Sequence, residues 1–505
     1  MKDLVFNNLY KSFVRIVSKK AFTHFFLLVT FLMALLLRSN SGLRSEAFID
    51  EASVYTIASG YDFKHLALMQ HWDVAHPPLL YIFARAAVLL NKGNFVDIHL
   101  IRIPFVFFSS LAVFSLYILA KKILRSNMAL FIPLWYAIHP FQILNGYGMR
   151  PYPILQLLFP IAFFALFDES WNKKWKVIAI NLLFIFLFYW DYSSIWFFMI
   201  FFGYLFIANF SQPKKIFNNL IQLSPFLISV FIWLPIFFSR LDDALNLANY
   251  IKPDLVRFFL TFTGLHLPQI IRGNYNSLFF ILLLLILFCN TWVSVVIKPY
   301  KNYLIALSAL GIPMIAFMIG IVIGPLLLAR NHIFTSLMYF IVFSPLLILK
   351  KGYVYGLIIS VFLVFNVVLS IQSYSLTNGE IIFSPSSFKN KFSGNAVFYF
   401  YKGYYSYALH YELLRNGYKL STNKQFSYYN DNSTLNIYTH RIDNETIRDL
   451  NYFQGSTTRA YFVSNPHVNY SDSDKVLINR YCLLDEQTYE HFENIYEHGI
   501  VECLN

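Results

Sequence analysis

Two acidic residues, Asp50 and Glu51, follow the first long apolar run of the chain and carry the clearest chemical signal in the sequence. A carboxylate just outside a membrane helix can accept the proton of a hydroxyl group, which is the role of a general base. We expect Asp50 to be that base. Glu51 points in another direction from the same helix and is expected to be a partner of Asp50, a second acid or a solvated surface acid.

A short amphipathic helix is expected to position these two acids. Val54, Ile57, Ala58 and Tyr61 follow the i, i+3, i+4, i+7 spacing of one helical face, so residues 51–59 form the helix and Gly60 ends it. Asp50 lies at the N-terminal edge of this helix. Its other interpretation is therefore an N-cap that accepts backbone N–H bonds.

Cationic side chains on the same side of the membrane could bind a phosphate group. The planar guanidinium fork of arginine binds two phosphate oxygens at once. Each of these side chains could instead contact lipid headgroups. The candidates are Arg102, Arg150 and Arg330, with Lys252 and Arg272 as weaker ones.

Three further polar residues join the candidate site. His76 precedes Pro77-Pro78 and could bind a phosphate or a sugar, or make a structural hydrogen bond. Asp191, in the stretch YWDYSS, is a candidate second acid. Tyr152 is a candidate substrate-binding residue next to Arg150.

Composition identifies the class of protein that holds these residues. Of 505 residues, 57% are hydrophobic and only 13% are charged, against about 25% charged in soluble proteins. The apolar runs are about 20 residues long, enough to cross a bilayer core. The sequence predicts an all-α polytopic membrane protein in the plasma (inner) membrane.

The distribution of basic residues predicts the topology. Short lysine and arginine clusters all fall on one side if the run at 79–90 does not cross the membrane, as the positive-inside rule requires. This predicts about eleven crossings, a cytoplasmic N-terminus and an extracytoplasmic C-terminus. The clusters are Lys121-Lys122-Arg125, Lys173-Lys174-Lys176, Lys214-Lys215, Lys298 with Lys301, and Lys350-Lys351.

The chain changes character near residue 373. Strand-like runs AVFYF, TLNIYTH and RAYFV alternate with helix-like segments, which predicts a small extracytoplasmic α/β domain over 373–505 after a membrane domain over 1–372. This tail holds 14 acidic and 11 basic residues. The net charge of +13 therefore belongs to the membrane part, and nucleic acid is not an expected partner. Cys482 and Cys503 could pair in an oxidising compartment.

Several motifs resemble one family, the bacterial branch of the GT-C superfamily, whose members transfer sugars from polyprenyl phosphates. These enzymes are related to protein O-mannosyltransferases and lipid A aminoarabinose transferases. The resemblance is strong over 20–200, thinner to about 372 and absent beyond. Two positions depart from the family pattern: Gly148 where a Glu is common, and Asp191 where a His is common. The motifs are Asp50-Glu51-Ala52, His76-Pro77-Pro78, Arg102-Ile103-Pro104, His139-Pro140-Phe141 and Arg150-x-Tyr152.

The resemblance implies an inverting glycosyltransferase with Asp50 as base, a polyprenyl-phosphate sugar as donor, and a lipid, glycan or protein as acceptor. The chain has no glycine-rich nucleotide loop and no paired-aspartate motif, which fits a lipid-phosphate leaving group. The sequence leaves the need for a divalent metal open. The alternative is a transporter or flippase for a lipid-linked saccharide. Transporters usually carry charges near the bilayer midplane and have duplicated halves, and neither pattern is visible here.

Overall fold

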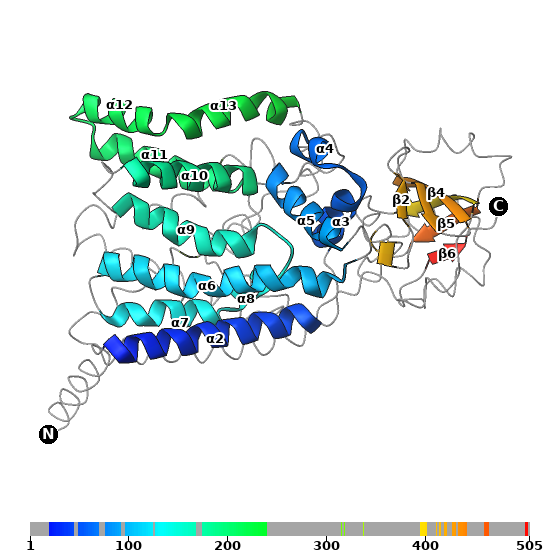
Figure 1. Ribbon diagram of the computed structural model, residues 1–505, viewed down its shortest axis with the longest axis horizontal. Helices are drawn as coiled ribbons and strands as arrows, with labels where there is room; N and C mark the ends of the chain where they lie inside the picture. The colour runs from blue at the N-terminus through cyan, green and yellow to red at the C-terminus, as the bar shows by residue number, and fades with distance from the viewer. Residues whose placement is uncertain are drawn as a thin grey trace, which may run out of the picture. The chain divides into compact units, whose positions relative to one another are not determined.

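The computed structural model describes residues 20–44, 49–69, 76–91, 96–124, 127–167 and 174–239, a few helical residues between 315 and 415, and six strands within 394–502. The chain forms two compact units (Figure 1). The first comprises residues 1–44, 74–80 and 102–377, and the second comprises 45–73, 81–101 and 378–505.

Among the described residues, two helices are long and apolar enough to cross a membrane, α2 (Lys20–Arg44) and α6 (Ile98–Leu124). A third span exists if α12 (Pro213–Gln222) and α13 (Ser224–Ser239), which meet at a 67° bend, are counted as one. The described part of the first unit is thus that of an α-helical membrane protein. The expectation of about eleven crossings reaches beyond the described residues and stays a prediction.

Helices η1 (Asn127–Leu130), α7 (Phe131–Ile138), α8 (Pro140–Leu144) and α9 (Tyr152–Phe167) follow α6. The chain leaves the helical conformation at His139, whose φ and ψ are −73° and 124°. The next residue, Pro140, disfavours a helical His139 and then opens α8, since its missing N–H needs no partner there. Helix α2 packs on both α7 and α8.

An aromatic core joins α10 (Lys174–Trp190), α11 (Ser194–Ala208) and α13. The buried Phe184 ring of α10 lies 4.7 Å from that of Phe201 and 5.6 Å from that of Phe226, both edge to face. Edge-to-face pairs are favourable because the positive ring edge meets the negative ring face. This cluster fixes the three helices against one another.

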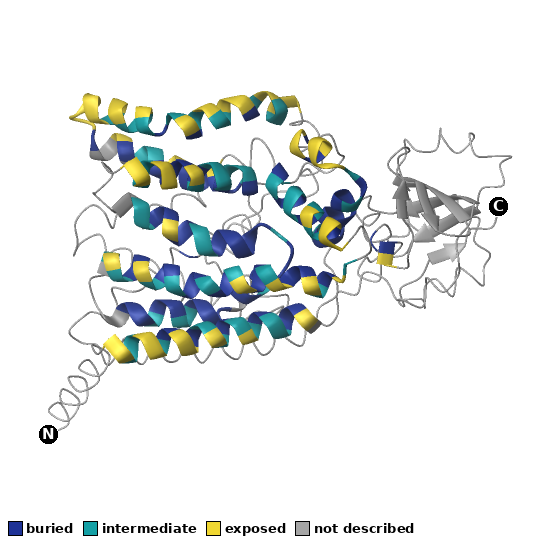
Figure 2. Ribbon diagram, in the orientation of Figure 1, coloured by how far each residue is buried: buried dark blue, intermediate teal, exposed yellow. Residues whose placement is uncertain are grey.

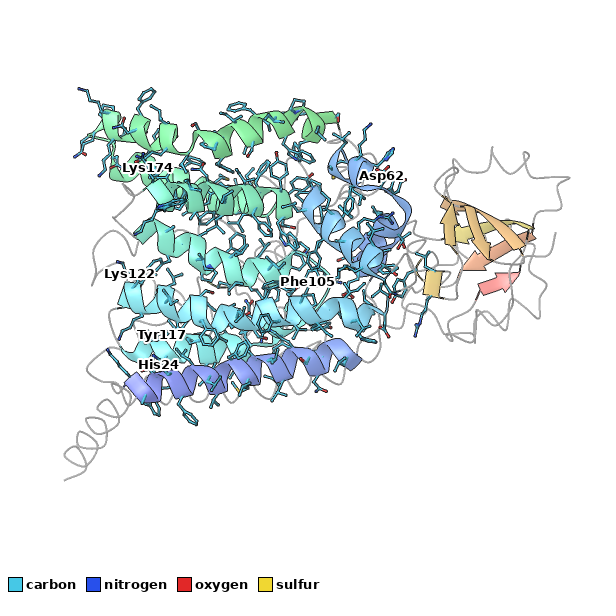
Figure 3. All side chains as sticks on the ribbon, viewed as in Figure 1. His24, Asp62, Phe105, Tyr117, Lys122 and Lys174 are labelled. Carbon is cyan, nitrogen blue, oxygen red and sulfur yellow. The ribbon has the colours of Figure 1, made fainter. Side chains whose placement is uncertain are left out.

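The two ends of the helices in the first unit differ in chemistry. Lys122 lies in the last turn of α6 and Lys174 begins α10, and both lie at the same end of the helices (Figure 3). Arg102 at the other end of α6 contacts Tyr147 in the segment between α8 and α9. Trp190 at the other end of α10 also bonds this segment. The segment between α8 and α9 and the turn after α10 therefore lie at the opposite end of these helices from the two lysines.

Helix α3 (Ile49–Gly60) agrees with the amphipathic helix expected over 51–59 and belongs to the second unit, as does α4 (Phe63–Ala67). Arg85 of α5 (Pro78–Leu90) donates from Nη1 to the carbonyls of Ala58 and Ser59, at 3.0 Å each. These are among the last carbonyls of α3, which lack helical partners. Burial lowers the pKa of this guanidinium. The 13-residue α5 spans about 20 Å, too short for a bilayer core of about 30 Å.

The second unit also holds a mixed six-stranded sheet with the order β2-β3-β4-β1-β5-β6. β1 pairs in parallel with β4 and β5, and the other neighbours are antiparallel. β1, β4 and β5 coincide with the three strand-like runs, whereas the helices expected in this region lie largely outside the described residues. The strands are β1 (Gly394–Phe400), β2 (Lys419–Ser421), β3 (Ser427–Asn430), β4 (Ser433–Arg441), β5 (Arg459–Val463) and β6 (Ile500–Glu502).

Candidate functional site

The segment Asn145–Pro151, between α8 and α9, organises the polar end of the first unit. All of its residues are buried except Arg150, which is half-buried. Arg102 is 1% exposed, and its guanidinium lies 5.4 Å from the centre of the Tyr147 ring. The same guanidinium donates from Nη1 to the Gly42 carbonyl of α2 at 2.7 Å. The segment is therefore tied to α6 and α2 through one arginine.

A second buried arginine, Arg38 of α2, lies beside the same segment. Its Nε donates to Ser109 Oγ at 2.7 Å, and its Nη1 lies 3.3 Å from the Ala137 carbonyl. A Cβ on Gly146 would come within 2.6 Å of Arg38 Nε and 2.5 Å of Ser109 Oγ. Only glycine fits here without moving these groups.

The arginine belongs to a network that spans five helices, α2, α6, α7, α8 and α9. Gln156 Oε1 of α9 accepts from Ser109 Oγ of α6 and lies 2.7 Å from Tyr136 Oη of α7. The Gln156 amide in turn donates to the Gln142 carbonyl of α8 at 3.1 Å. Arg38 lies 4.7 Å from the centre of the Tyr136 ring. Such polar groups among apolar helices are costly to bury unless they are bonded, and here they bond one another.

Asp191 and His76 form a close pair in the same unit. Asp191 Oδ2 lies 3.4 Å from His76 Nδ1, and the two side chains are 7% and 13% exposed. Asp191 Oδ1 accepts the backbone N–H of Ser193 at 2.8 Å, which holds the carboxylate at the start of α11. A carboxylate held in this way orients the imidazole ring that it faces.

The Asp191 turn is joined to the segment Asn145–Pro151. The indole Nε1 of Trp190 donates to the Pro151 carbonyl at 2.9 Å. The Asp191 turn and the segment Asn145–Pro151 are thus directly bonded. The structure brings together His76 and Asp191. It also places Asp191 next to the segment Asn145–Pro151, which contains Arg150 and leads into Tyr152.

Asp50 and Glu51 lie in the first turn of α3, in the second unit. Negative charge in a first turn interacts favourably with the helix dipole. Asp50 is the second residue of α3, inside the helix rather than before it, and is half-buried. Glu51 is 0% exposed, so its interpretation as a solvated acid is wrong.

Tyr55 anchors α3 within the second unit. Its hydroxyl accepts the Val96 backbone N–H at 2.8 Å, and its ring meets that of Tyr411 edge to face at 5.6 Å. Burial raises the pKa of this phenol. The helix that carries both acids therefore packs against a residue of the C-terminal part of the chain.

The other predicted residues divide into two groups. Tyr152 is buried at the start of α9, and Arg150 is half-buried just before it. Arg330, Lys252 and Arg272 lie outside the described residues, as do Cys482 and Cys503. Within the described residues, no group of three or more His, Cys, Asp or Glu side chains could hold a metal ion.

Sequence reasoning missed Arg38 and its partners. The available signal was an arginine in an apolar helix, together with Ser109 and Gln156 in other apolar helices. Ionisable residues in membrane segments usually face the interior of a bundle. A scan of the chain against protein-family models found no matching family, and a search of curated proteins found no matching sequence.

Proposed function

We propose that this protein is a membrane glycosyltransferase that moves a sugar from a polyprenyl-phosphate donor to a hydroxyl acceptor. The observation that carries the proposal is the His76–Asp191 pair, which lies next to the segment Asn145–Pro151. This segment contains Arg150 and leads into Tyr152. These residues were singled out separately from the sequence, and such a grouping of acid, imidazole and cation supports chemistry on an anionic substrate.

In the proposed reaction, the acceptor oxygen attacks the anomeric carbon and the bond from this carbon to the phosphate oxygen breaks. The bonding electrons leave with polyprenyl phosphate, and the acceptor proton passes to Asp50. One displacement inverts the configuration of the sugar carbon. Arg150 and Arg330 stabilise the phosphate as its charge develops, with Lys252 and Arg272 as further candidates. His76 and Tyr152 bind the donor or acceptor, and Asp191 orients the His76 imidazole.

The role proposed for Arg102 differs from the phosphate binding expected from the sequence. Its guanidinium is almost fully buried and bonds the Gly42 carbonyl. We assign it to holding the segment Asn145–Pro151 in place, so that it acts on the phosphate through Arg150 rather than by direct contact.

The proposal includes the location of the protein. The chain lies in the plasma membrane with about eleven crossings, its N-terminus in the cytoplasm and its C-terminal α/β domain outside. The contact of Tyr55 with Tyr411 supports a role for this domain in acceptor choice, because α3 carries Asp50.

Donor turnover tests the function directly. Purified full-length protein is incubated with synthetic polyprenyl-phosphate hexoses and pentoses and with a membrane extract as the source of acceptor. Release of polyprenyl phosphate, followed by mass spectrometry, is expected with at least one donor. If a labelled lipid-linked saccharide crosses the membrane of proteoliposomes that contain the protein, and no donor is cleaved, the transporter alternative is correct instead.

A further inference from the structure

Helix α12 has two chemically distinct faces. Its polar residues and its apolar residues alternate in pairs along the sequence, which at helical spacing places each set on one side. Lys214 and Lys215 are the charged residues of α12, and both are basic. The polar set is Lys214, Lys215, Asn218, Asn219 and Gln222, and the apolar set is Ile216, Phe217, Leu220 and Ile221.

Within the part of the chain that the structure describes, the apolar face is only partly covered. No residue of α12 is buried, and Phe217 is 64% and Ile221 54% exposed (Figure 2). Phe210, just before the helix, is 83% exposed. An exposed apolar stripe of this kind on a short helix needs an apolar partner.

The bend between α12 and α13 is built into the fold. At the break, the Gln222 carbonyl and the Phe226 N–H are bonded by one buried side chain, that of Asn181 of α10. Its Nδ2 donates to the Gln222 carbonyl at 2.8 Å, and its Oδ1 accepts the Phe226 N–H at 3.1 Å. Leu223, at the break itself, is 0% exposed. The bend of 67° between α12 and α13 is therefore fixed by hydrogen bonds to Asn181 of α10.

This angle has a direct consequence in a bilayer. When the apolar α13 lies along the membrane normal, α12 lies close to the membrane plane. The helix then presents Phe217 and Ile221 to the acyl chains, and Lys214 and Lys215 to the headgroups. Lys174, at the start of α10, lies at the same end of the unit as α12 (Figure 3).

We propose that α12 lies in the membrane interface as an in-plane helix and that Lys214 and Lys215 bind the headgroups of anionic phospholipids. Charge complementarity identifies this occupant, because α12 carries two lysines and no acid. Apolar burial and attraction to anionic lipid together determine the binding of such helices. The inference is independent of the proposed glycosyl transfer.

Label depth tests the position of the helix. In full-length protein with Cys289, Cys482 and Cys503 replaced, an environment-sensitive fluorophore is attached at Ile221→Cys or at Asn219→Cys, and the protein is placed in phosphatidylcholine–phosphatidylglycerol nanodiscs. The polar-face label is placed at residue 219 because residues 218 and 221 are neighbours on the helix surface. We expect spin-labelled acyl chains to quench the label at residue 221 and aqueous iodide to quench the label at residue 219. Equal quenching of both labels by iodide would overturn the in-plane position.

Lipid selectivity tests the partner. Native mass spectrometry of protein released from mixed nanodiscs is expected to show bound phosphatidylglycerol enriched over phosphatidylcholine. Each of Lys214→Gln and Lys215→Gln should reduce this enrichment by about fivefold. Lys64→Gln, an exposed lysine of α4, is the matched control and should leave it unchanged. Unchanged enrichment in both α12 variants, or dimers that Phe217→Ser separates, would show that the face binds something other than anionic lipid.

Discussion

His76 and Asp191, far apart in the sequence, face each other at 3.4 Å between Nδ1 and Oδ2 in an almost buried pair. The carboxylate is held by the Ser193 N–H, so the pair has a defined geometry on the protein side. The neighbouring Trp190 connects it to the segment Asn145–Pro151. This arrangement makes Asp191 a positioning residue for the imidazole.

Asp191→Asn should separate this role from a purely structural one. The amide oxygen can still accept the Ser193 N–H, so the unfolding temperature should stay close to that of the wild type, while the charge that faces His76 is lost. We expect donor cleavage to slow by about a hundredfold through kcat, with KM nearly unchanged. Steady-state release of polyprenyl phosphate measures both constants.

A surface pair of the same residue types provides the control for that variant. Asp97 accepts the His99 backbone N–H, and its Oδ1 lies 4.0 Å from His99 Nε2, but Asp97 is exposed and immediately precedes α6. Asp97→Asn should therefore cleave donor at the wild-type rate. Equal rates in the wild type, Asp191→Asn and Asp97→Asn would exclude a role for the buried pair in the reaction.

Gly146→Ala should destabilise the protein. The new Cβ would lie 2.6 Å from the Gln142 carbonyl and from Arg38 Nε, so backbone or the buried network must shift. Such overpacking costs about 1–3 kcal/mol, and thermal unfolding in detergent measures the cost. Gly203→Ala on α11 is the matched control, because nothing lies within 4 Å of its Cβ. It should be neutral or stabilising by up to about 1 kcal/mol; equal effects of the two changes would contradict the close packing at Gly146.

Part of the described fold could be predicted because the spacing of hydrophobic residues reports directly on helices. In the second unit, the helix over 51–59 was expected nearly where α3 lies. Three strands of the C-terminal sheet also followed from local pattern. Arg38 was not singled out, since its position near the end of an apolar run looks like that of an ordinary flanking basic residue.

Long-range pairing within the candidate site could not be predicted. Nothing local to His76 or Asp191 indicates the other, because their approach depends on how α10 and α11 pack. The burial of Glu51 was also missed, since helical spacing gives its direction on α3 but not what covers it. Arg102 was expected at a phosphate, and its bond to the Gly42 carbonyl depends on the path of α2.

Asn181→Leu should destabilise the junction of α12 and α13. The change leaves a buried N–H at Phe226 and the Gln222 carbonyl without the bonds that Asn181 makes. Each unsatisfied buried group costs about 1–3 kcal/mol. Chemical denaturation in detergent should show this loss. Leu182→Ala, on the exposed side of the same helix, should lower the free energy of unfolding much less. A comparable loss of stability in both variants would argue against a role for the two Asn181 hydrogen bonds at this junction.

The start of α4 should be sensitive to acid. The His65 backbone N–H and ring bond the Asp62 carboxylate and lower its pKa. Because the folded-state pKa lies below the unfolded value of about 3.9, the stabilisation is complete above that pH and is lost as pH falls through the lowered pKa. Hydrogen exchange of peptides over 61–69, corrected for intrinsic rates, should show protection that falls only below about pH 4. In Asp62→Asn this protection should not change with pH; protection in the wild type that is equally insensitive to pH would contradict the cap.

The most direct test of the account compares Asp50 of α3 with Asp62, which caps α4, in single-turnover donor cleavage. Asp50→Asn removes the proposed base, whereas Asp62→Asn changes an exposed helix cap outside the proposed site. The account predicts that Asp50→Asn releases polyprenyl phosphate about a thousandfold more slowly than the wild type, with an unchanged unfolding temperature, and that Asp62→Asn matches the wild type. Wild-type release by Asp50→Asn, or no release by any form of the protein, would contradict it.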